Sequence, residues 1–295
     1  MQLHLSAKGE NLDYIRTRVD QLVTAFPWVQ MVLLSELAVH GPVHANAEPL
    51  PGPTEDSLAE LAARHDIWLI TGSLYERHED KVYNTCSVIN PKGQVIARYR
   101  KIFPFQPFSA GTSPGDEFVV FDVPGIGRFG ISICYDIWFP EHSRTLVAMG
   151  AEVILHPVLT ATTDREVELS IARATAVVNQ CYVIDVNGVA GGGVGRSLFV
   201  GPEGDVIHQA GPNEALLPLE IDLDRVRRVR ERGIHTLGQP LKSFRDAPVR
   251  FEVYDPDSPL RAYLHTLGPL EKPGRPSPPD PAAMASEAMT AKEPR

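Results

Sequence analysis

The order of apolar runs along the chain restricts its fold more than any other feature. Short apolar runs typical of buried strands alternate with amphipathic segments typical of helices. This alternation predicts an α/β fold in which helices cover the faces of a sheet. Tight Gly/Pro turns between some runs indicate hairpins, so mixed sheets are expected. The expected strands are residues 29–34, 67–75, 83–89, 95–100, 118–123, 129–133, 153–156, 182–186, 197–200, 206–209 and 216–221. The expected helices are residues 11–24, 57–64, 141–149, 166–178 and 222–232.

Composition and charge exclude several classes of protein. Apolar residues make up 43% of the 295 residues and charged residues 22%, so the chain can bury a substantial core. The net charge of -9 and the lack of a long basic run argue against a nucleic-acid-binding protein and against an anionic membrane surface. No apolar run approaches the ~18 residues of a membrane span. A small or neutral partner fits this composition best.

Composition also divides the chain into a folded part and a tail. Residues 1–267 contain no break in composition and are predicted to form one domain. Residues 268–295 are rich in Pro, Ala and Glu and poor in aromatic and β-branched residues. Such a segment buries too little surface to offset the entropy lost on ordering, so we expect a disordered tail.

The cysteines and the N-terminus favour neither a metal site nor an export signal. Three cysteines, an odd number at wide spacing, form no C-x-x-C pair. We therefore expect no metal site. The N-terminus lacks a basic segment followed by an apolar one, so no signal peptide is expected. Free thiols fit a reducing compartment, which predicts a cytoplasmic protein.

One cysteine stands at the end of a predicted strand. Residues 129–133 alternate as a strand and end at Cys134, and Pro140 then opens a helix. α/β sheets bind ligands at the carboxyl ends of their strands, and a helix N-terminus there favours a thiolate and a developing oxyanion. A lone cysteine is more often a small buried hydrophobe, which is how we interpret Cys86 and Cys181.

Two charged residues also end predicted strands. Glu36 follows the apolar run 32–34, and Lys101 follows the strand 95–100. A single charge at a strand end is usually a solvated loop residue, but a thiol nucleophile needs both a base and a stabiliser of the oxyanion. Three neighbouring strands would bring Glu36, Lys101 and Cys134 together at one edge.

These three strand ends resemble the motifs of the nitrilase superfamily of carbon–nitrogen hydrolases. Residues 33–37, Leu-Leu-Ser-Glu-Leu, resemble its glutamate motif. Residues 99–102, Tyr-Arg-Lys-Ile, resemble its lysine motif, and residues 134–141, Cys-Tyr-Asp-Ile-Trp-Phe-Pro-Glu, its cysteine motif. Weaker signatures, such as Asn84 within Tyr-Asn-Thr, lie between and beyond them. The resemblance extends over residues 2–265.

The resemblance implies a four-layer α-β-β-α sandwich with two mixed β-sheets, and association into homodimers. It also implies a mechanism without a cofactor. Glu36 accepts the proton of Cys134, and the thiolate attacks the carbonyl carbon of a small amide. Lys101 and the backbone N–H of Tyr135 stabilise the oxyanion, and water then hydrolyses the thioester. Nitriles and N-carbamoyl compounds are alternative substrates for the same three residues.

Two further positions bear on activity and substrate. Ser109 stands where many family members have a second glutamate, and the acidic residues Asp116 and Glu117 follow it. This difference leaves open a catalytically silent member that acts as a dimeric binding or scaffold protein. Trp138 stands where omega-amidase-like members often have Arg, so the resemblance implies a small neutral amide. The alternative for Trp138 is core or dimer packing.

Overall fold

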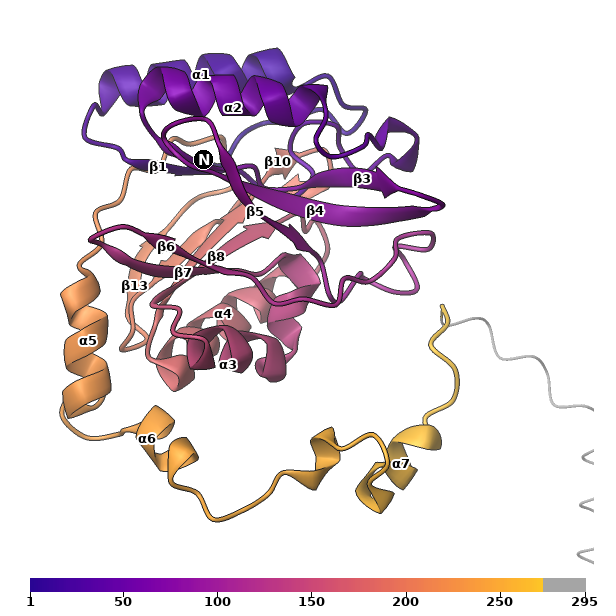
Figure 1. Cartoon of the computed structure of the whole chain (residues 1–295), viewed down its shortest axis with the longest axis vertical. Coiled ribbons are helices and arrows are strands. Elements are labelled where there is room, and N and C mark those ends of the chain that lie inside the picture. The colour runs from indigo at the N-terminus through magenta and orange to yellow at the C-terminus, as the bar shows by residue number, and fades with distance from the viewer. Residues whose placement is uncertain (273–295) are drawn as a thin grey trace, which may run out of the picture. The chain divides into compact units, whose positions relative to one another are not determined.

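Two β-sheets and their flanking helices make up most of the computed structural model, which describes residues 1–272 (Figure 1). The first sheet has five strands in the order β1-β2-β4-β3, with β5 also paired to β4. Its strands are β1 (Met31–Leu33), β2 (Trp68–Ile70), β3 (Leu74–His78), β4 (Lys81–Ile89) and β5 (Val95–Arg100).

The second sheet has six strands in the order β13-β12-β9-β8-β7-β6. Its strands are β6 (Val120–Val123), β7 (Gly127–Ile131), β8 (Val153–Val158), β9 (Tyr182–Asn187), β12 (Leu198–Val200) and β13 (Val206–Gln209). A short antiparallel pair consists of β10 (Val189–Ala190) and β11 (Gly193–Val194). In each sheet parallel pairs, such as β1–β2 and β7–β8–β9, occur beside antiparallel pairs, so the prediction of mixed sheets is confirmed.

The helices form the two outer layers. Helices α1 (Leu12–Ala25) and α2 (Pro53–His65) cover one face of the first sheet, and α3 (Pro140–Ala148) and α4 (Arg165–Asn179) cover one face of the second (Figure 1). The four-layer α-β-β-α sandwich expected from the resemblance is therefore confirmed. Helices α5 (Leu223–Arg232) and α6 (Pro240–Arg245) follow the last strand.

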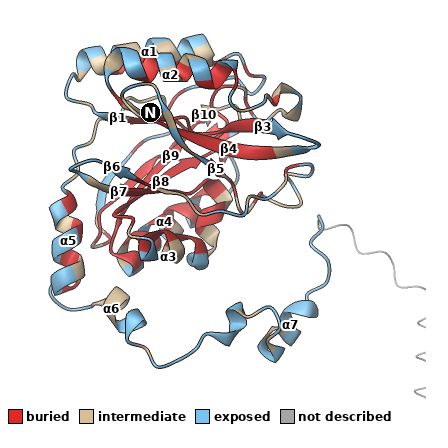
Figure 2. Ribbon diagram, viewed as in Figure 1, coloured by how far each residue is buried: buried red, intermediate tan, exposed pale blue. Residues whose placement is uncertain are grey.

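Buried apolar side chains form one cluster in each of the three spaces between these layers. Figure 2 colours the buried residues of the strands and helices red. Ile15 and Leu58 are among those between the first helices and the first sheet. Tyr99 and Ile131 are among those between the two sheets, and Leu146 packs between the second sheet and its helices. Alternating side chains on strands and spaced side chains on helices thus serve the same packing.

Several element ends follow the predicted local rules, and one does not. Asp222 caps α5 by accepting a hydrogen bond from the backbone N–H of Asp224. Gly150, just past α3, has φ 101°, the left-handed conformation expected there. The predicted start of a helix at residue 57 is wrong, because α2 begins at Pro53, a residue preorganised for the first helical position.

Residues 216–221 are not a strand, contrary to prediction. Ala215 pairs with Gln2 in an isolated bridge, and no ladder continues from it. Leu217, Leu219 and Ile221 still pack against the core between the sheets, which explains their alternating pattern.

Among the described residues, a second compact unit consists of residues 106–108 and 251–272. Its described part contains the short helices η3 (Glu252–Tyr254), η4 (Pro259–Arg261) and α7 (Ala262–His265). The predicted domain of residues 1–267 stays a prediction. The predicted tail, residues 268–295, lies from residue 273 onward outside the residues that the structure describes. Within residues 1–272, no helix is long and apolar enough to cross a membrane.

Candidate active site

Glu36 and Lys101 meet at the ends of their strands. The Lys101 ammonium donates a hydrogen bond to Glu36 Oε1 at 2.8 Å, and the two side chains are only 3% and 5% exposed. Cys134 follows β7 in the other sheet, and the charges of Glu36 and Lys101 both act on its thiol. The structure therefore brings the three predicted residues into one buried electrostatic group.

The backbone around Glu36 is fixed by both sheets. The first sheet approaches so closely that a Cβ on Gly72 would lie 1.9 Å from the carbonyl oxygen of Ser35, so only glycine fits there. The amide that follows Glu36 donates to Ser73 Oγ at 2.9 Å. The amide of Glu36 itself donates to the carbonyl of Val158 in the second sheet at 3.3 Å. These bonds hold Glu36 at the junction between the sheets.

Asn84 holds both members of the ion pair. Its side-chain amide donates to Glu36 Oε1 at 2.8 Å, and its carbonyl accepts from the amide of Lys101 at 2.8 Å. Burial lowers the pKa of the Lys101 ammonium, but the charges of Glu36, Cys134 and Asp136 outweigh it and raise that pKa above its ordinary value. Lys101 is therefore a permanent cation in this site.

Cys134 occupies a strained turn. It has φ 46°, a conformation that is uncommon for a residue with a side chain and occurs often at functional sites. It is also the first residue of the short helix η2 (Cys134–Trp138). Burial and the Glu36 carboxylate raise the pKa of the thiol far more than Lys101 lowers it. The helix N-terminus therefore does not produce a resting thiolate, contrary to prediction, and the neutral thiol needs a base.

The Asp136 carboxylate ties the cysteine turn to the lysine loop. It accepts hydrogen bonds from the backbone N–H of Ile133 at 2.8 Å and of Phe103 at 2.9 Å. It also accepts from the hydroxyl of Tyr99 at 2.7 Å. Asp136 is fully buried, and its three hydrogen bonds link the segment that carries Cys134 to the segment that carries Lys101. We infer that Asp136 sets the position of Cys134 relative to Lys101.

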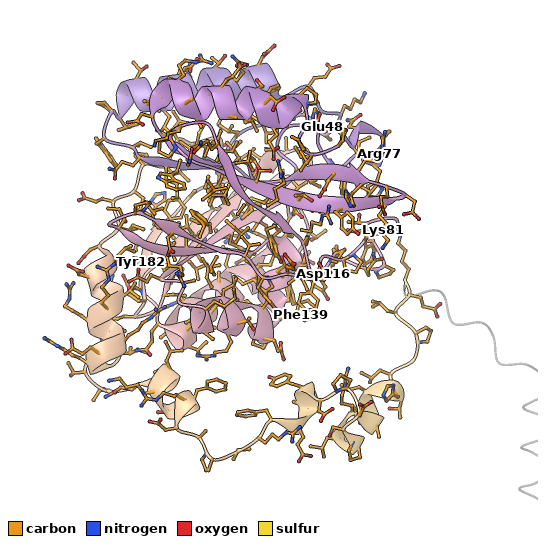
Figure 3. All side chains as sticks on the ribbon, in the orientation of Figure 1. Glu48, Arg77, Lys81, Asp116, Phe139 and Tyr182 are labelled. Atoms are coloured by element: carbon orange, nitrogen blue, oxygen red, sulfur yellow. The ribbon has the colours of Figure 1, made fainter. Side chains whose placement is uncertain are left out.

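The remaining predicted residues lie on the same two loops. Tyr135 is half-buried, with its ring centroid 5.0 Å from that of Phe105 and 5.2 Å from that of Phe139, which Figure 3 labels. Trp138 packs against the core beneath the second sheet, and its indole N–H is buried without a hydrogen-bond partner. Ser109 is half-buried in a turn, where its amide donates to the carbonyl of Phe105.

Four polar residues around the site were not assigned a role from the sequence. Asn84 and Asp136 belong to the quoted motifs, so their spacing was a usable signal. Thr160 follows β8 and Glu168 lies on α4, so neither belongs to a motif that the sequence analysis used. Thr160 Oγ1 is 3.7 Å from Cys134 Sγ and donates to Glu168 Oε1 at 3.0 Å.

The two acidic residues that follow Ser109 in the sequence are not buried. Asp116, which Figure 3 labels, and Glu117 are both exposed. The charge of Asp116 acts on Arg100, whose guanidinium pairs with Glu76. Neither residue therefore supplies a buried carboxylate at the nucleophile.

An apolar cavity elsewhere in the molecule is not this site. Its volume is about 390 Å³, and it lies between the sheets, lined by residues such as Met31, Trp68, Phe129 and Leu219. These residues surround the beginnings of the parallel strands, whereas Cys134 follows the end of β7. Across residues 1–272, no group of three or more His, Cys, Asp or Glu side chains is arranged to hold a metal ion.

Comparison with known proteins identifies the family. The family model for carbon–nitrogen hydrolase matches residues 7–231. The omega-amidase NIT2 of Homo sapiens is 34% identical over 200 residues, which cover 63% of this chain and 72% of that protein. The omega-amidase NIT2 of Danio rerio is 31% identical over 252 residues, covering 78% and 90%.

Solved structures agree with this assignment. Nit3 of Saccharomyces cerevisiae, described as a member of branch 10 of the nitrilase superfamily, has a TM-score of 0.72 and 27% identity, covering 78% of this chain and 91% of its own. An amidase from Nesterenkonia sp. has a TM-score of 0.69 and 26% identity, covering 78% and 92%. This protein therefore belongs to the carbon–nitrogen hydrolase family and is an enzyme of the amidase or nitrilase type.

Proposed function

We propose that the enzyme hydrolyses a small aliphatic amide to a carboxylate and ammonia through a thioester on Cys134. The observation that carries this proposal is the buried Lys101–Glu36 pair beside a neutral thiol. The names of the relatives support amide chemistry. A variant of the Nesterenkonia amidase carries the acetamide moiety of fluoroacetamide, covalently added at its active-site cysteine, with a TM-score of 0.69 and 25% identity.

In the acylation step, Glu36 accepts the Sγ proton of Cys134 while sulfur forms a bond to the carbonyl carbon. The electron pair of the C=O bond moves onto oxygen, where the Lys101 ammonium and the backbone N–H of Tyr135 stabilise the oxyanion. The intermediate collapses, the C–N bond breaks, and Glu36 gives its proton to the leaving nitrogen. The products of this step are ammonia and the thioester.

In the deacylation step, a water molecule gives a proton to Glu36 as its oxygen bonds to the thioester carbon. The same two donors stabilise the second oxyanion. The C–S bond then breaks, the product leaves as the carboxylic acid and loses its proton to solvent, and Cys134 recovers its proton from Glu36. One carboxylate thus serves as base and acid in both halves of the cycle.

The substrate proposal rests on Trp138 and its aromatic neighbours. Trp138 lies 6.0 Å from Tyr135 between ring centroids, and an aromatic side chain offers no charge to pair with a second carboxylate on the substrate. We therefore propose a neutral amide. Nitriles and N-carbamoyl compounds remain alternative substrates of the same residues.

Ammonia release tests this function. Purified protein is incubated with a panel of short aliphatic amides, dicarboxylic monoamides, nitriles and N-carbamoyl compounds, and Cys134→Ala serves as the control. The expected result is release from neutral amides that the control lacks. Release from dicarboxylic monoamides alone would contradict the proposed substrate class, and release only from nitriles or carbamoyl compounds would contradict the reaction.

A catalytically silent dimeric binding or scaffold protein is the second candidate, favoured by Ser109 in place of the second glutamate. Folded protein that releases no ammonia from any compound of the panel, and that shows no adduct at Cys134, would support it. The same samples therefore distinguish the two functions.

We also propose a homodimer in the cytoplasm. The exposed apolar side chains Val167 and Val178 on α4 support an interface on that helix, and the three free thiols support a reducing compartment. Sedimentation equilibrium tests the dimer, and Val167→Glu should weaken it. Cell fractionation tests the location.

A further inference from the structure

Besides Glu36 and Asp136, another buried carboxylate is connected to Cys134, through the hydroxyl group of Thr160. Thr160, two residues after β8, places its Oγ1 3.7 Å from Cys134 Sγ and donates its hydroxyl proton to Glu168 Oε1 at 3.0 Å. Glu168 lies in the first turn of α4 and is 3% exposed. One hydroxyl group therefore connects the sulfur to a carboxylate that the proposed mechanism does not use.

Both ends of this connection are held firmly. Asn187 clamps the backbone of Thr160, accepting from its amide at 3.0 Å and donating to its carbonyl at 2.9 Å. Arg165 pairs with Glu168 at 3.2 Å, and the same guanidinium holds Asp185. The hydroxyl of Thr160 can rotate, but neither its oxygen nor the carboxylate can move far.

The direction of the hydrogen bonds depends on the charge of Glu168. A hydroxyl group has one proton to donate, and an ionised Glu168 takes it, so only lone pairs of Thr160 face Cys134. This arrangement favours the neutral S–H, which donates to Thr160. A protonated Glu168 donates to Thr160 instead, and the hydroxyl then points its proton at the sulfur and favours the thiolate. The reversal needs one proton on Glu168 and one rotation of the hydroxyl.

We propose that Thr160 and Glu168 are positioning residues that set the direction of the hydrogen bond at Cys134 and thereby how readily this thiol ionises. The proposal rests on the assignment of Cys134 as the nucleophile in the proposed function. While Glu168 is ionised, the pair keeps the thiol neutral and oriented, so that the thiolate forms only when Glu36 takes the proton.

The surroundings of Glu168 raise its pKa into the weakly acidic range. Burial and the Asp185 carboxylate raise the pKa of Glu168 to about 6, although Arg165 and Thr160 lower it. The charged and titratable groups around the pair are Arg165 from α4, Asp185 from β9 and His156 from β8, which lies 4.0 Å from Asp185. Glu36 and Lys101 also act on the thiol. The ionised form of Glu168 therefore prevails above that pH, and the neutral form below it.

The substitution Glu168→Gln tests the proposal. Arg165 can bond only the oxygen of a glutamine, so the NH₂ group turns toward Thr160 and forces its hydroxyl to donate to Cys134. The rate of alkylation of Cys134 by iodoacetamide is followed against pH by peptide mass. We expect the midpoint of this profile to fall by about one pH unit relative to wild type.

Two further variants separate this effect from a general loss of charge. Thr160→Val removes the connecting hydroxyl, so adding Glu168→Gln to it should give only a small further shift. Glu55→Gln is the matched control, because Glu55 is also buried, accepts from the Ser87 hydroxyl and pairs with Arg98, yet lies on α2. It should leave the profile unchanged.

An unchanged midpoint in Glu168→Gln, or an equal shift with and without the Thr160 hydroxyl, overturns the proposal. If Glu168→Gln does not fold, Thr160→Val alone tests the proposal. The S–H group then loses its acceptor, so the midpoint of the alkylation profile should fall. An unchanged profile overturns the proposal. Alkylation requires no turnover. A protein that hydrolyses no amide would thus fail the proposed function and still test this pair.

Discussion

The Nζ atom of Lys101 lies 2.8 Å from Oε1 of Glu36, and both groups are almost completely shielded from solvent. Breaking a buried ion pair by removing one partner costs about 3–5 kcal/mol, because the other charge is left unpaired. Both hydrogen bonds from Asn84 and Lys101 go to the same oxygen of Glu36, Oε1. In the proposed mechanism, the pair combines a fixed cation for the oxyanion with a base that exchanges protons.

The raised pKa of Lys101 predicts the alkaline side of the pH profile. Because the folded pKa lies above the ordinary value of 10.5, Lys101 stays charged as the pH rises, and its contribution to stability is lost only above that value. We expect kcat/KM to stay level between about pH 7.5 and 9.5. A fall centred near pH 9 in protein that is still folded would mean that Lys101 loses its proton within the working range.

Asn84→Ala should slow the reaction more than it weakens substrate binding. The substitution removes a charge-assisted hydrogen bond to Glu36, worth about 2 kcal/mol, so kcat should fall about 30-fold with KM changed little. The control is Asn90→Ala, which alters an exposed hairpin turn after the same strand. Equal kinetics for both variants would show that Asn84 does not position Glu36.

Asp136→Asn should separate the cysteine turn from the lysine loop. The amide replaces one acceptor oxygen by a donor, so one of the two backbone N–H groups, of Ile133 or of Phe103, loses its partner. We expect a loss of about 2 kcal/mol in unfolding free energy and a drop in kcat. Tyr99→Phe leaves both backbone N–H bonds to Asp136 in place, although it also removes the contacts of the hydroxyl with Ile102 and His142, and it should have the smaller effect on kcat. Urea unfolding and kcat are measured for both variants. A wild-type kcat in Asp136→Asn would show that Asp136 does not position Cys134 relative to Lys101.

Ser109→Glu should raise kcat if Lys101 needs a second carboxylate to hold its ammonium. Positional errors of about 1 Å can cost a hundredfold in rate, and serine carries no charge to prevent them. The new carboxylate also competes with Glu36 for a proton, so the gain should appear mainly where Glu36 is ionised. kcat is measured against pH for both proteins. A folded variant that is slower at every pH would show that Ser109 is a working part of a different site.

The succession of strands and helices, and the meeting of Glu36, Lys101 and Cys134, could be predicted from the sequence for a physical reason. Alternating and helical apolar patterns fix which face of each element is buried, and strand ends fix where Glu36, Lys101 and Cys134 emerge. The four-layer arrangement itself came from the family resemblance, because periodicity does not specify how sheets stack.

Other features depend on contacts between segments far apart in the chain. Residues 216–221 have the pattern of a strand, yet a strand also needs a neighbour to bond. Glu168 is connected to Cys134 only through Thr160, which lies in the loop after another strand, and no spacing in the sequence encodes the contact between Thr160 and Cys134. The raised pKa of Cys134 likewise results from burial and from Glu36 rather than from the adjacent helix.

Mass spectrometry of the protein during turnover tests the central claim most directly. The protein is mixed with a neutral amide substrate, the reaction is quenched during turnover, and the digested peptides that contain Cys134, Cys86 and Cys181 are compared. The proposed mechanism predicts an added acyl group on Cys134 alone. Cys134→Ala should show no adduct and release no ammonia, whereas Cys86→Ala should retain both. Ammonia release at the wild-type rate by Cys134→Ala, or an acyl group on another residue, would contradict it.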